Sequence, residues 1–166
     1  MDIYTVSFFG HRLVERASEI EVRLEILLHD LITQKEYVEF LIGRDGEFDL
    51  LAASSIRRAV NQYGYGNTSI ILVLPYMKAE YRDNEQNYLS YYDEVEICSE
   101  SSNAYYKSAI QVRNRCMVDR SDLVVCCIQH NSGGAYKTVQ YAIKQGKQVR
   151  NLADCHFDSG IKVEDS

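Results

Sequence analysis

The sequence predicts an α/β fold, in which one domain is built from three layers around a mainly parallel sheet of five strands. Short apolar runs rich in β-branched residues alternate along the chain with segments whose apolar residues recur every three to four positions, and these patterns are typical of buried strands and amphipathic helices. Strands separated by helices pair in parallel, with helices on both faces of the sheet. Glycine-containing polar turns follow several of these strands, at the edge where open sheets of this kind bind ligands.

The expected strands are short, and the first, third and fourth are apolar runs that indicate burial inside the sheet. They cover residues 3–9, 37–42, 69–74, 123–128 and 148–152. The clearest helix is predicted over 18–33, where Ile20, Leu24 and Leu28 belong to one apolar stripe. Further helices are expected from residue 48 to about 63, over 104–118 and over 135–144.

The segment between residues 76 and 102 has no clear period and is rich in tyrosines and acids. We expect it to pass over the ligand-binding face of the sheet, with about one helical turn. At 166 residues, the chain is expected to form one domain over 1–153, followed by a polar tail over 154–166. No internal repeat, low-complexity run or linker divides it.

Composition limits the classes of partner. The hydrophobic fraction of 46% and the charged fraction of 25% are ordinary for a soluble globular protein. The net charge of −6 argues against a nucleic-acid backbone as the main partner, because such partners usually bind a basic face. No apolar run approaches the ~20 residues that span a bilayer, and no signal peptide opens the chain, so we expect a cytoplasmic protein that does not bind membranes. Sheet edges and helix faces commonly pair in such folds, and a homodimer is expected.

The five cysteines are an odd number without the spacing of a metal site. We interpret them as buried, reduced thiols rather than as catalytic or redox residues. No run of histidine, cysteine and carboxylate residues suggests a metal, and the P-loop pattern with its lysine is absent. The sequence therefore predicts neither a metal nor a cofactor.

The strongest functional pattern is the turn between the fourth expected strand and the last helix. It carries Ser132, Gly133 and Gly134, and Thr138 lies one turn into the helix. Glycines allow the backbone to approach a ligand closely. The free N–H groups and the dipole of a helix start favour negative charge. We therefore predict that this turn binds an anion such as a phosphate.

A second polar turn, Gly10-His11-Arg12, follows the first strand. Arg12 offers a planar fork of donors that grips oxyanions, and His11 can donate to the same oxyanion. The alternative is a surface turn with two polar residues. Arg113 and Asn114, late in their helix, also allow two interpretations: a ligand contact, or a solvated face with intrahelical ion pairs.

The loop from Gly43 to Asp49 follows the second strand and supplies Glu47 and Asp49 near a helix start. Acids are expected there as caps and as partners of the helix dipole. The alternative is a contact with a ribose or a base. Gly43 would belong to the binding turn, and Glu47 and Asp49 would be catalytic only if the protein is an enzyme.

Together these segments resemble the SLOG superfamily, and within it the small DUF1273/YpsA-like group, over about residues 3–152. The matching residues are Phe9-Gly10-His11-Arg12; Gly43, Gly46 and Phe48-Asp49; Arg113-Asn114, Met117-Val118-Asp119 and Ser121-Asp122; and Ser132-Gly133-Gly134, Thr138-Val139, Tyr141-Ala142 and Gly146-Lys147. The resemblance implies a Rossmann-like fold and a nucleotide-derived ligand. Members of the superfamily include sensors of nucleotide signals and phosphoribohydrolases, which release a base from a nucleoside monophosphate.

Those hydrolases carry a Pro-Gly-Gly-x-Gly-Thr-x-x-Glu turn. Here the two glycines and Thr138 remain at slightly different spacing, but Tyr141 stands three residues later, where the hydrolases have their glutamate. The resemblance therefore implies the anion-binding turn, and it implies hydrolysis only if Glu47 or Asp49 replaces the missing acid. The leading hypothesis is a small nucleotide-type ligand bound for sensing, sequestration or regulation. The alternatives are a nucleoside-monophosphate N-glycoside hydrolase or transferase, and a protein-interaction module.

Overall fold

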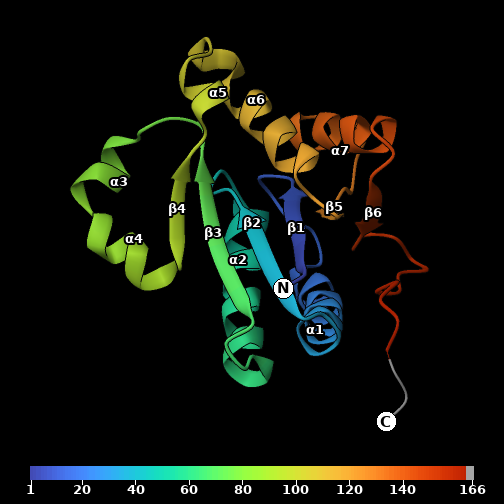
Figure 1. The fold of residues 1–166 in the computed structure, drawn as a ribbon. Coiled ribbons are helices and arrows are strands. Elements are labelled where there is room, and N and C mark those ends of the chain that lie inside the picture. The colour runs from blue at the N-terminus through green and yellow to red at the C-terminus, as the bar shows by residue number, and fades with distance from the viewer. Residues whose placement is uncertain (164–166) are drawn as a thin grey trace.

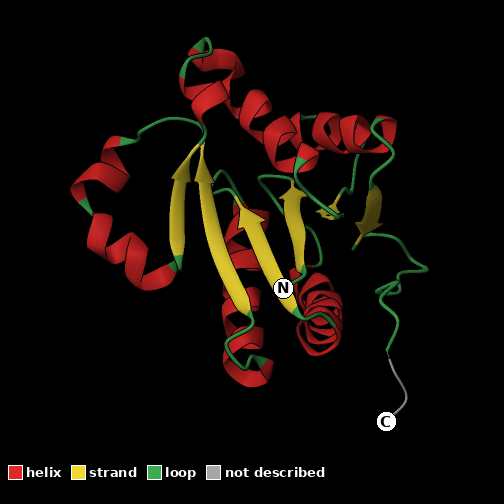
Figure 2. Ribbon diagram, viewed as in Figure 1, coloured by secondary structure: helices red, strands yellow, loops and turns green. Residues whose placement is uncertain are grey.

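In the computed structural model, which describes residues 1–163, the chain forms a sheet of six parallel strands in the order β4-β3-β2-β1-β5-β6 (Figure 1). The strands are β1 (Ile3–Gly10), β2 (Tyr37–Ile42), β3 (Thr68–Leu74), β4 (Glu94–Ile97), β5 (Leu123–Cys127) and β6 (Gln148–Asn151). The helices are α1 (Ala17–Gln34), α2 (Glu47–Tyr63), α3 (Ala79–Asp83), α4 (Glu85–Tyr91), α5 (Ser99–Ser102), α6 (Tyr106–Asp119) and α7 (Gly134–Lys144). Figure 2 shows helices in the connections between the strands, so the fold is α/β and Rossmann-like.

Over the described residues the sheet has one strand more than the sequence predicts, so the prediction of five strands is wrong. The additional strand is β4, which lies at the sheet edge and pairs only with β3. It is four residues long, and Glu94 and Glu96 alternate with Val95 and Ile97. A short, charged strand is typical of a sheet edge, where it discourages further pairing, and it gives little apolar signal in the sequence.

The helices that precede β4, α3 and α4, lie beside the edge of the sheet rather than over the ligand-binding face (Figure 1). Figure 1 shows α3 and α4 beyond β4, on the far side from β3. Tyr88 and Tyr92 are buried in the apolar cluster that also contains residues of α1 and α2. The Arg44 guanidinium lies 4.9 Å from the Tyr88 ring centroid and donates to Tyr92 Oη at 3.3 Å. The tyrosines therefore attach α4 to the core.

Alternation along β1 sends its side chains to two apolar clusters, one on each face of the sheet. Val6 and Phe8 pack with residues of α1 and α2, whereas Phe9 packs with residues of α6 and α7. The apolar stripe predicted for the first helix is confirmed, since Ile20, Leu24, Leu27, Leu28 and Leu31 are all buried. The sheet is therefore covered by α1 and α2 on one face and by α6 and α7 on the other.

The segment after β6 returns to α1. The Nη1 atom of Arg23 donates to the carbonyl of Asp154 at 2.9 Å, and Ser159 Oγ donates to Asp30 Oδ2 at 2.6 Å. Phe157 and Ile161 are partly buried against the α1 and α2 cluster. The tail predicted over 154–166 is thus in contact with the domain as far as Ile161, and residues 164–166 lie outside the described part of the chain. Among the described helices, none has the length and apolar character that a membrane crossing requires.

Candidate functional site

The strand order creates a crevice at the carboxyl ends of β1 and β5. These strands are neighbours, but β1 leads to α1 on one face of the sheet and β5 leads to α7 on the other. Ligands of open α/β sheets bind where the connections diverge in this way. A cavity of about 420 Å³ lies at this point, a size typical of small-molecule sites.

Most of the residues predicted to form the site line this cavity. They are Gly10, His11 and Arg12 after β1; Gly43 and Asp49 after β2; Arg113 and Asn114 on α6; and Gly133 and Gly134 at the start of α7. Three predicted residues, Glu47, Ser132 and Thr138, do not line it. The fold therefore brings together turns from three separated parts of the sequence.

Glu47 belongs to the contact between the loops after β1 and β2. Its backbone N–H donates to the Arg12 carbonyl at 2.9 Å, and its exposed carboxylate accepts from the backbone N–H of Val14 at 2.8 Å. Gly46 allows this approach, because a Cβ there would lie 2.7 Å from Arg12 Cα. Glu47 thus positions the loop that carries Arg12 and does not line the cavity.

The start of α7 is open to an anion. Gly133, its N-cap residue, has φ 92° and ψ 176°, a backbone conformation found almost only in glycine. No side chain caps the helix, and the first intrahelical bond returns from Lys137 N to the Gly133 carbonyl. The N–H groups of the first turn therefore have no helix acceptor. Gly133, Gly134 and Ala135 line the cavity, so these donors lie at its wall.

Two imidazole rings join the loops after β1 and β5. His11 and His130 stack at a centroid distance of 3.7 Å and an interplanar angle of 10°. His11 is buried, and among the described residues its Nε2 is a buried side-chain atom without a hydrogen-bond partner. Burial lowers the pKa of His11, and the charge of the neighbouring His130 lowers it further, so the site favours the neutral ring.

A buried arginine forms the base of the cavity. Arg113 is 2% exposed, and it donates from Nη1 to the Val73 carbonyl at 2.8 Å, from Nη2 to Asp45 Oδ2 at 2.5 Å and from Nε to Asn114 Oδ1 at 2.9 Å. Burial raises the pKa of Asp45, but the charges of Arg113 and Lys78 outweigh this effect, and the pKa is lowered. The solvated face considered for Arg113 is therefore wrong, and its charge is compensated within the protein.

Asp49 lies near the ion pair of Arg113 and Asp45. Its Oδ2 accepts from the backbone N–H of Asp45 at 2.9 Å, and among the described residues no hydrogen bond reaches its Oδ1. Burial raises the pKa of Asp49 to about 6, against the hydrogen bond from Asp45. A carboxyl group that titrates near neutral pH inside a cavity is typical of functional sites.

Thr138 connects the two helices that border the cavity. It is buried, its Oγ1 accepts from Asn114 Nδ2 at 3.0 Å, and it bonds to the Gly134 carbonyl at 3.0 Å. Gln111 Nε2 donates to the same carbonyl at 3.2 Å. Thr138 thus fixes the start of α7 against α6, whereas the exposed Ser132 bonds to His130 Nδ1 at 3.2 Å.

Three polar residues of the cavity wall were not among those predicted: Asp45, Gln111 and His130. His130 is an exposed loop residue that also lines the cavity, and its place after a strand, like that of His11, is a usable signal. Gln111 lies three residues before Asn114, so a helix puts both on one face. Nothing in the sequence pairs Asp45 with Arg113.

No protein-family model and no curated protein sequence matches the chain. The chain is similar in structure to DNA processing protein A (DprA) from Streptococcus pneumoniae, with a TM-score of 0.60 and 16% identity over 89% of this chain and 49% of that one. DprA from Helicobacter pylori gives a TM-score of 0.61 and 15% identity over 88% and 63%. The protein TM1055 gives a TM-score of 0.56 and 17% identity over 88% and 72%.

At these identities the likeness is one of fold, and the chain spans about half of one DprA and less than two thirds of the other. The Rossmann-like fold agrees with the resemblance to the SLOG superfamily. The structure of H. pylori DprA concerns its binding of single-stranded DNA. The expectation of a small ligand with no nucleic-acid backbone is therefore overturned, because a protein of this fold binds single-stranded DNA.

Proposed function

We propose that the cavity binds a nucleotide unit, with its phosphate at the start of α7 and its sugar towards Asp49. The observation that carries this proposal is the buried Nε2 of His11, which lines the cavity and has no partner among the described residues. An unsatisfied buried polar group costs about 1–3 kcal/mol. A ligand atom bonded to this nitrogen would recover that energy.

The phosphate is supported by the donors around His11. The uncapped start of α7 offers backbone N–H groups at Gly134 and Ala135, and the helix dipole favours negative charge there. Arg12 lines the same cavity and is exposed, and no described residue forms an ion pair with it. Its guanidinium can therefore turn to a phosphate.

The sugar is supported by Asp49. A carboxylate accepts hydrogen bonds from sugar hydroxyls, and Oδ1 of Asp49 is free for this among the described residues. A ligand that fits the cavity would place an anion at the start of α7 and hydroxyl donors at Asp49. A nucleotide has both groups, in its phosphate and its sugar. Two sources supply this chemistry: a free nucleotide, which would make the protein a sensor or regulator, and a nucleotide within a single strand of nucleic acid.

Titration calorimetry with a panel of mononucleotides and short single-stranded oligonucleotides separates these sources. We expect Arg12→Ala to weaken binding by about 10- to 100-fold, because a hydrogen bond to a charged group contributes about 1.5–3 kcal/mol. The control is Arg82→Ala, which removes an exposed arginine on α3 and should leave binding unchanged. Absence of binding across the panel, or equal affinity of the two variants, would contradict the proposal.

His11→Phe tests directly whether Nε2 of His11 binds the ligand. Phenylalanine keeps a flat ring against His130 but has no nitrogen at the position of Nε2. We expect the variant to be as stable as the wild type or more stable, since it loses an unsatisfied polar atom, and yet to bind the nucleotide at least about 10-fold more weakly. A variant that binds as the wild type does would show that Nε2 does not contact the ligand.

A second function, cleavage of the N-glycosidic bond of a nucleoside monophosphate, is favoured by Asp49 alone. A carboxylate in the cavity can stabilise the oxocarbenium-like centre that forms as the base leaves. Chromatography of free base after incubation tests this. Asp49→Asn should abolish release, and Glu47→Gln should retain it, because Glu47 lies outside the cavity. If the wild type releases no base from any nucleotide that it binds, the protein is not a hydrolase of this kind.

A further inference from the structure

A second group of side chains with ligand-binding chemistry lies outside the cavity. Cys98, Glu100 and Cys116 each present one potential metal ligand, and these three atoms lie within 4.8 Å of one another. Cys98 directly follows β4, Glu100 lies in α5 and Cys116 lies in α6. Sequence spacing does not show this group, because most of α6 separates Cys116 from the other two residues.

The donor set is selective for one class of metal. Two thiols and a carboxylate are ligands of Zn²⁺, with Zn–S distances of about 2.3 Å and Zn–O distances of about 2.0–2.2 Å. In such a tetrahedron two sulfur atoms lie roughly 3.8 Å apart. The present separation of at most 4.8 Å therefore needs only small side-chain rotations. Mg²⁺ and Ca²⁺ prefer oxygen ligands throughout, so the thiols select against them.

The surroundings leave room for an ion. The three residues line a second cavity of about 280 Å³, together with Glu96 and Arg120. Glu96 is already engaged, since its Oε2 accepts from Arg120 Nη1 at 2.6 Å. Cys98 is buried, Cys116 half-buried and Glu100 exposed, so the group is closed on one side and open to solvent at the carboxylate. An ion held there can take a water molecule as its fourth ligand.

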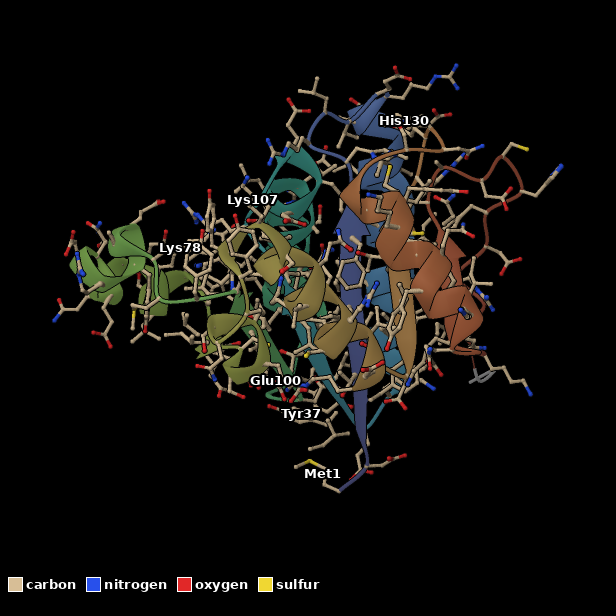
Figure 3. All side chains as sticks on the ribbon, turned by 90° about the horizontal axis from the view of Figure 1, so that it is seen from above. Met1, Tyr37, Lys78, Glu100, Lys107 and His130 are labelled. Atoms are coloured by element: carbon tan, nitrogen blue, oxygen red, sulfur yellow. The ribbon has the colours of Figure 1, made fainter. Side chains whose placement is uncertain are left out.

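We propose that Cys98, Glu100 and Cys116 bind a thiophilic divalent cation of the Zn²⁺ type. The ion would fasten the connection after β4 to α6, which is the helix that carries Arg113 and Asn114. Figure 3 shows Glu100 well apart from His130, and the two cavities share no described lining residue. The metal site is thus separate from the proposed nucleotide site, and either one can fail without the other.

Titration of the reduced protein with Co²⁺, followed by absorption, tests the site. We expect one equivalent to bind with a sulfur-to-cobalt charge-transfer band, and Zn²⁺ to displace it. Cys116→Ser should weaken or remove the band, and Glu100→Gln should lower the affinity by at least about 10-fold. The matched control is Cys155→Ser, which removes an exposed cysteine outside the group and should change nothing.

Melting temperatures of the metal-free variants show whether each one folds. Glu100→Gln should disturb folding least, because Glu100 is exposed. Addition of Zn²⁺ should raise the melting temperature of the wild type and of Cys155→Ser by the same amount, and that of Cys116→Ser and Glu100→Gln by less. Absence of the band in the wild type, or an equal band in a Cys98→Ser/Cys116→Ser double variant, would overturn the proposal. So would a Cys98–Cys116 disulfide that forms when the Zn²⁺-treated protein is exposed to dissolved oxygen as the oxidant, seen by mass spectrometry as the loss of two hydrogens.

Discussion

At the residue scale, Arg113 shows how a charge in a cavity can be structural. Three of its nitrogens bond to protein acceptors, one of them the carboxylate of Asp45. The side chain holds together β3, the loop after β2 and α6, because its acceptors lie on Val73, Asp45 and Asn114. A ligand that reaches this part of the wall meets a neutral pair rather than a free cation.

Arg113→Met should lower the free energy of unfolding by about 2–4 kcal/mol, because the Val73 carbonyl loses this donor and the Asp45 carboxylate keeps only its longer contact with Lys78 among the described residues. The measurement is urea denaturation at pH 7. Arg115→Met, on the exposed side of the same helix, is the control and should cost about 0.5–1 kcal/mol, since it removes the stacking of the exposed Arg115 guanidinium on the Tyr141 ring. Equal losses in the two variants would show that the buried pair adds no stability.

Asp49 makes the stability of the protein depend on pH. Burial raises its pKa from 3.8 to about 6, so the native state binds this proton more tightly than the unfolded chain does. The corresponding stabilisation is complete below about pH 4 and is lost as the pH rises through about 6. Above that pH the protein carries an unfavourable buried charge.

Asp49→Asn removes this charge and keeps an oxygen acceptor for the Asp45 N–H. We expect the variant to be more stable than the wild type by about 1–3 kcal/mol at pH 7, and equally stable at pH 3.5. Thermal and urea denaturation across this pH range measure the difference. A constant difference at all pH values would mean that Asp49 does not titrate between the two states.

At the scale of elements, the turn before α7 and the turn after it offer a matched pair of glycines. Gly133 has φ 92° and Gly146 has φ 74°, and an added Cβ would meet no atom within 4 Å at either position. Alanine at each position therefore introduces backbone strain of about 1–3 kcal/mol without a clash. Only Gly133 lines the cavity.

Gly133→Ala and Gly146→Ala should lower the melting temperature to a similar extent, whereas only Gly133→Ala should weaken nucleotide binding, by about 10-fold or more. The reason is that strain at Gly133 moves the N–H groups of the first turn of α7. Calorimetry and thermal unfolding of both variants provide the measurement. Unchanged affinity in Gly133→Ala would place the phosphate elsewhere.

The sequence predicted most elements of this fold, because their apolar periodicity is strong. It missed β4, whose charged residues and short length resemble a loop. The glycine turns of the site were predictable from their position after strands. The ion pair of Asp45 and Arg113 could not be predicted from the sequence. It depends on how α6 crosses the end of β3, a tertiary arrangement that local patterns do not encode.

At the scale of the whole molecule, the segment after β6 completes the packing of α1. Phe157 and Ile161 bury part of their surface there, and Ser159 bonds to Asp30. A chain that ends at residue 153 should lose about 1–3 kcal/mol of unfolding free energy, mainly from this apolar burial. Urea denaturation measures the loss, and Ser159→Ala should reproduce no more than about 1 kcal/mol of it. A truncated chain of unchanged stability would show that the segment does not contribute to the fold.

The loops that flank the crevice can form their hydrogen bonds to each other only late in synthesis of the chain. The backbone N–H of Glu15 donates to Gln129 Oε1, and Gln129 Nε2 donates back to the carbonyl of Glu15, across 114 positions of sequence. A nascent chain that has left the ribosome only as far as β4 has the basic turn but not the glycines that face it. A ligand that contacts both turns, as we propose, would therefore bind only after synthesis has passed α7. Supply of such a ligand would then favour the finished domain over every incomplete form of the chain.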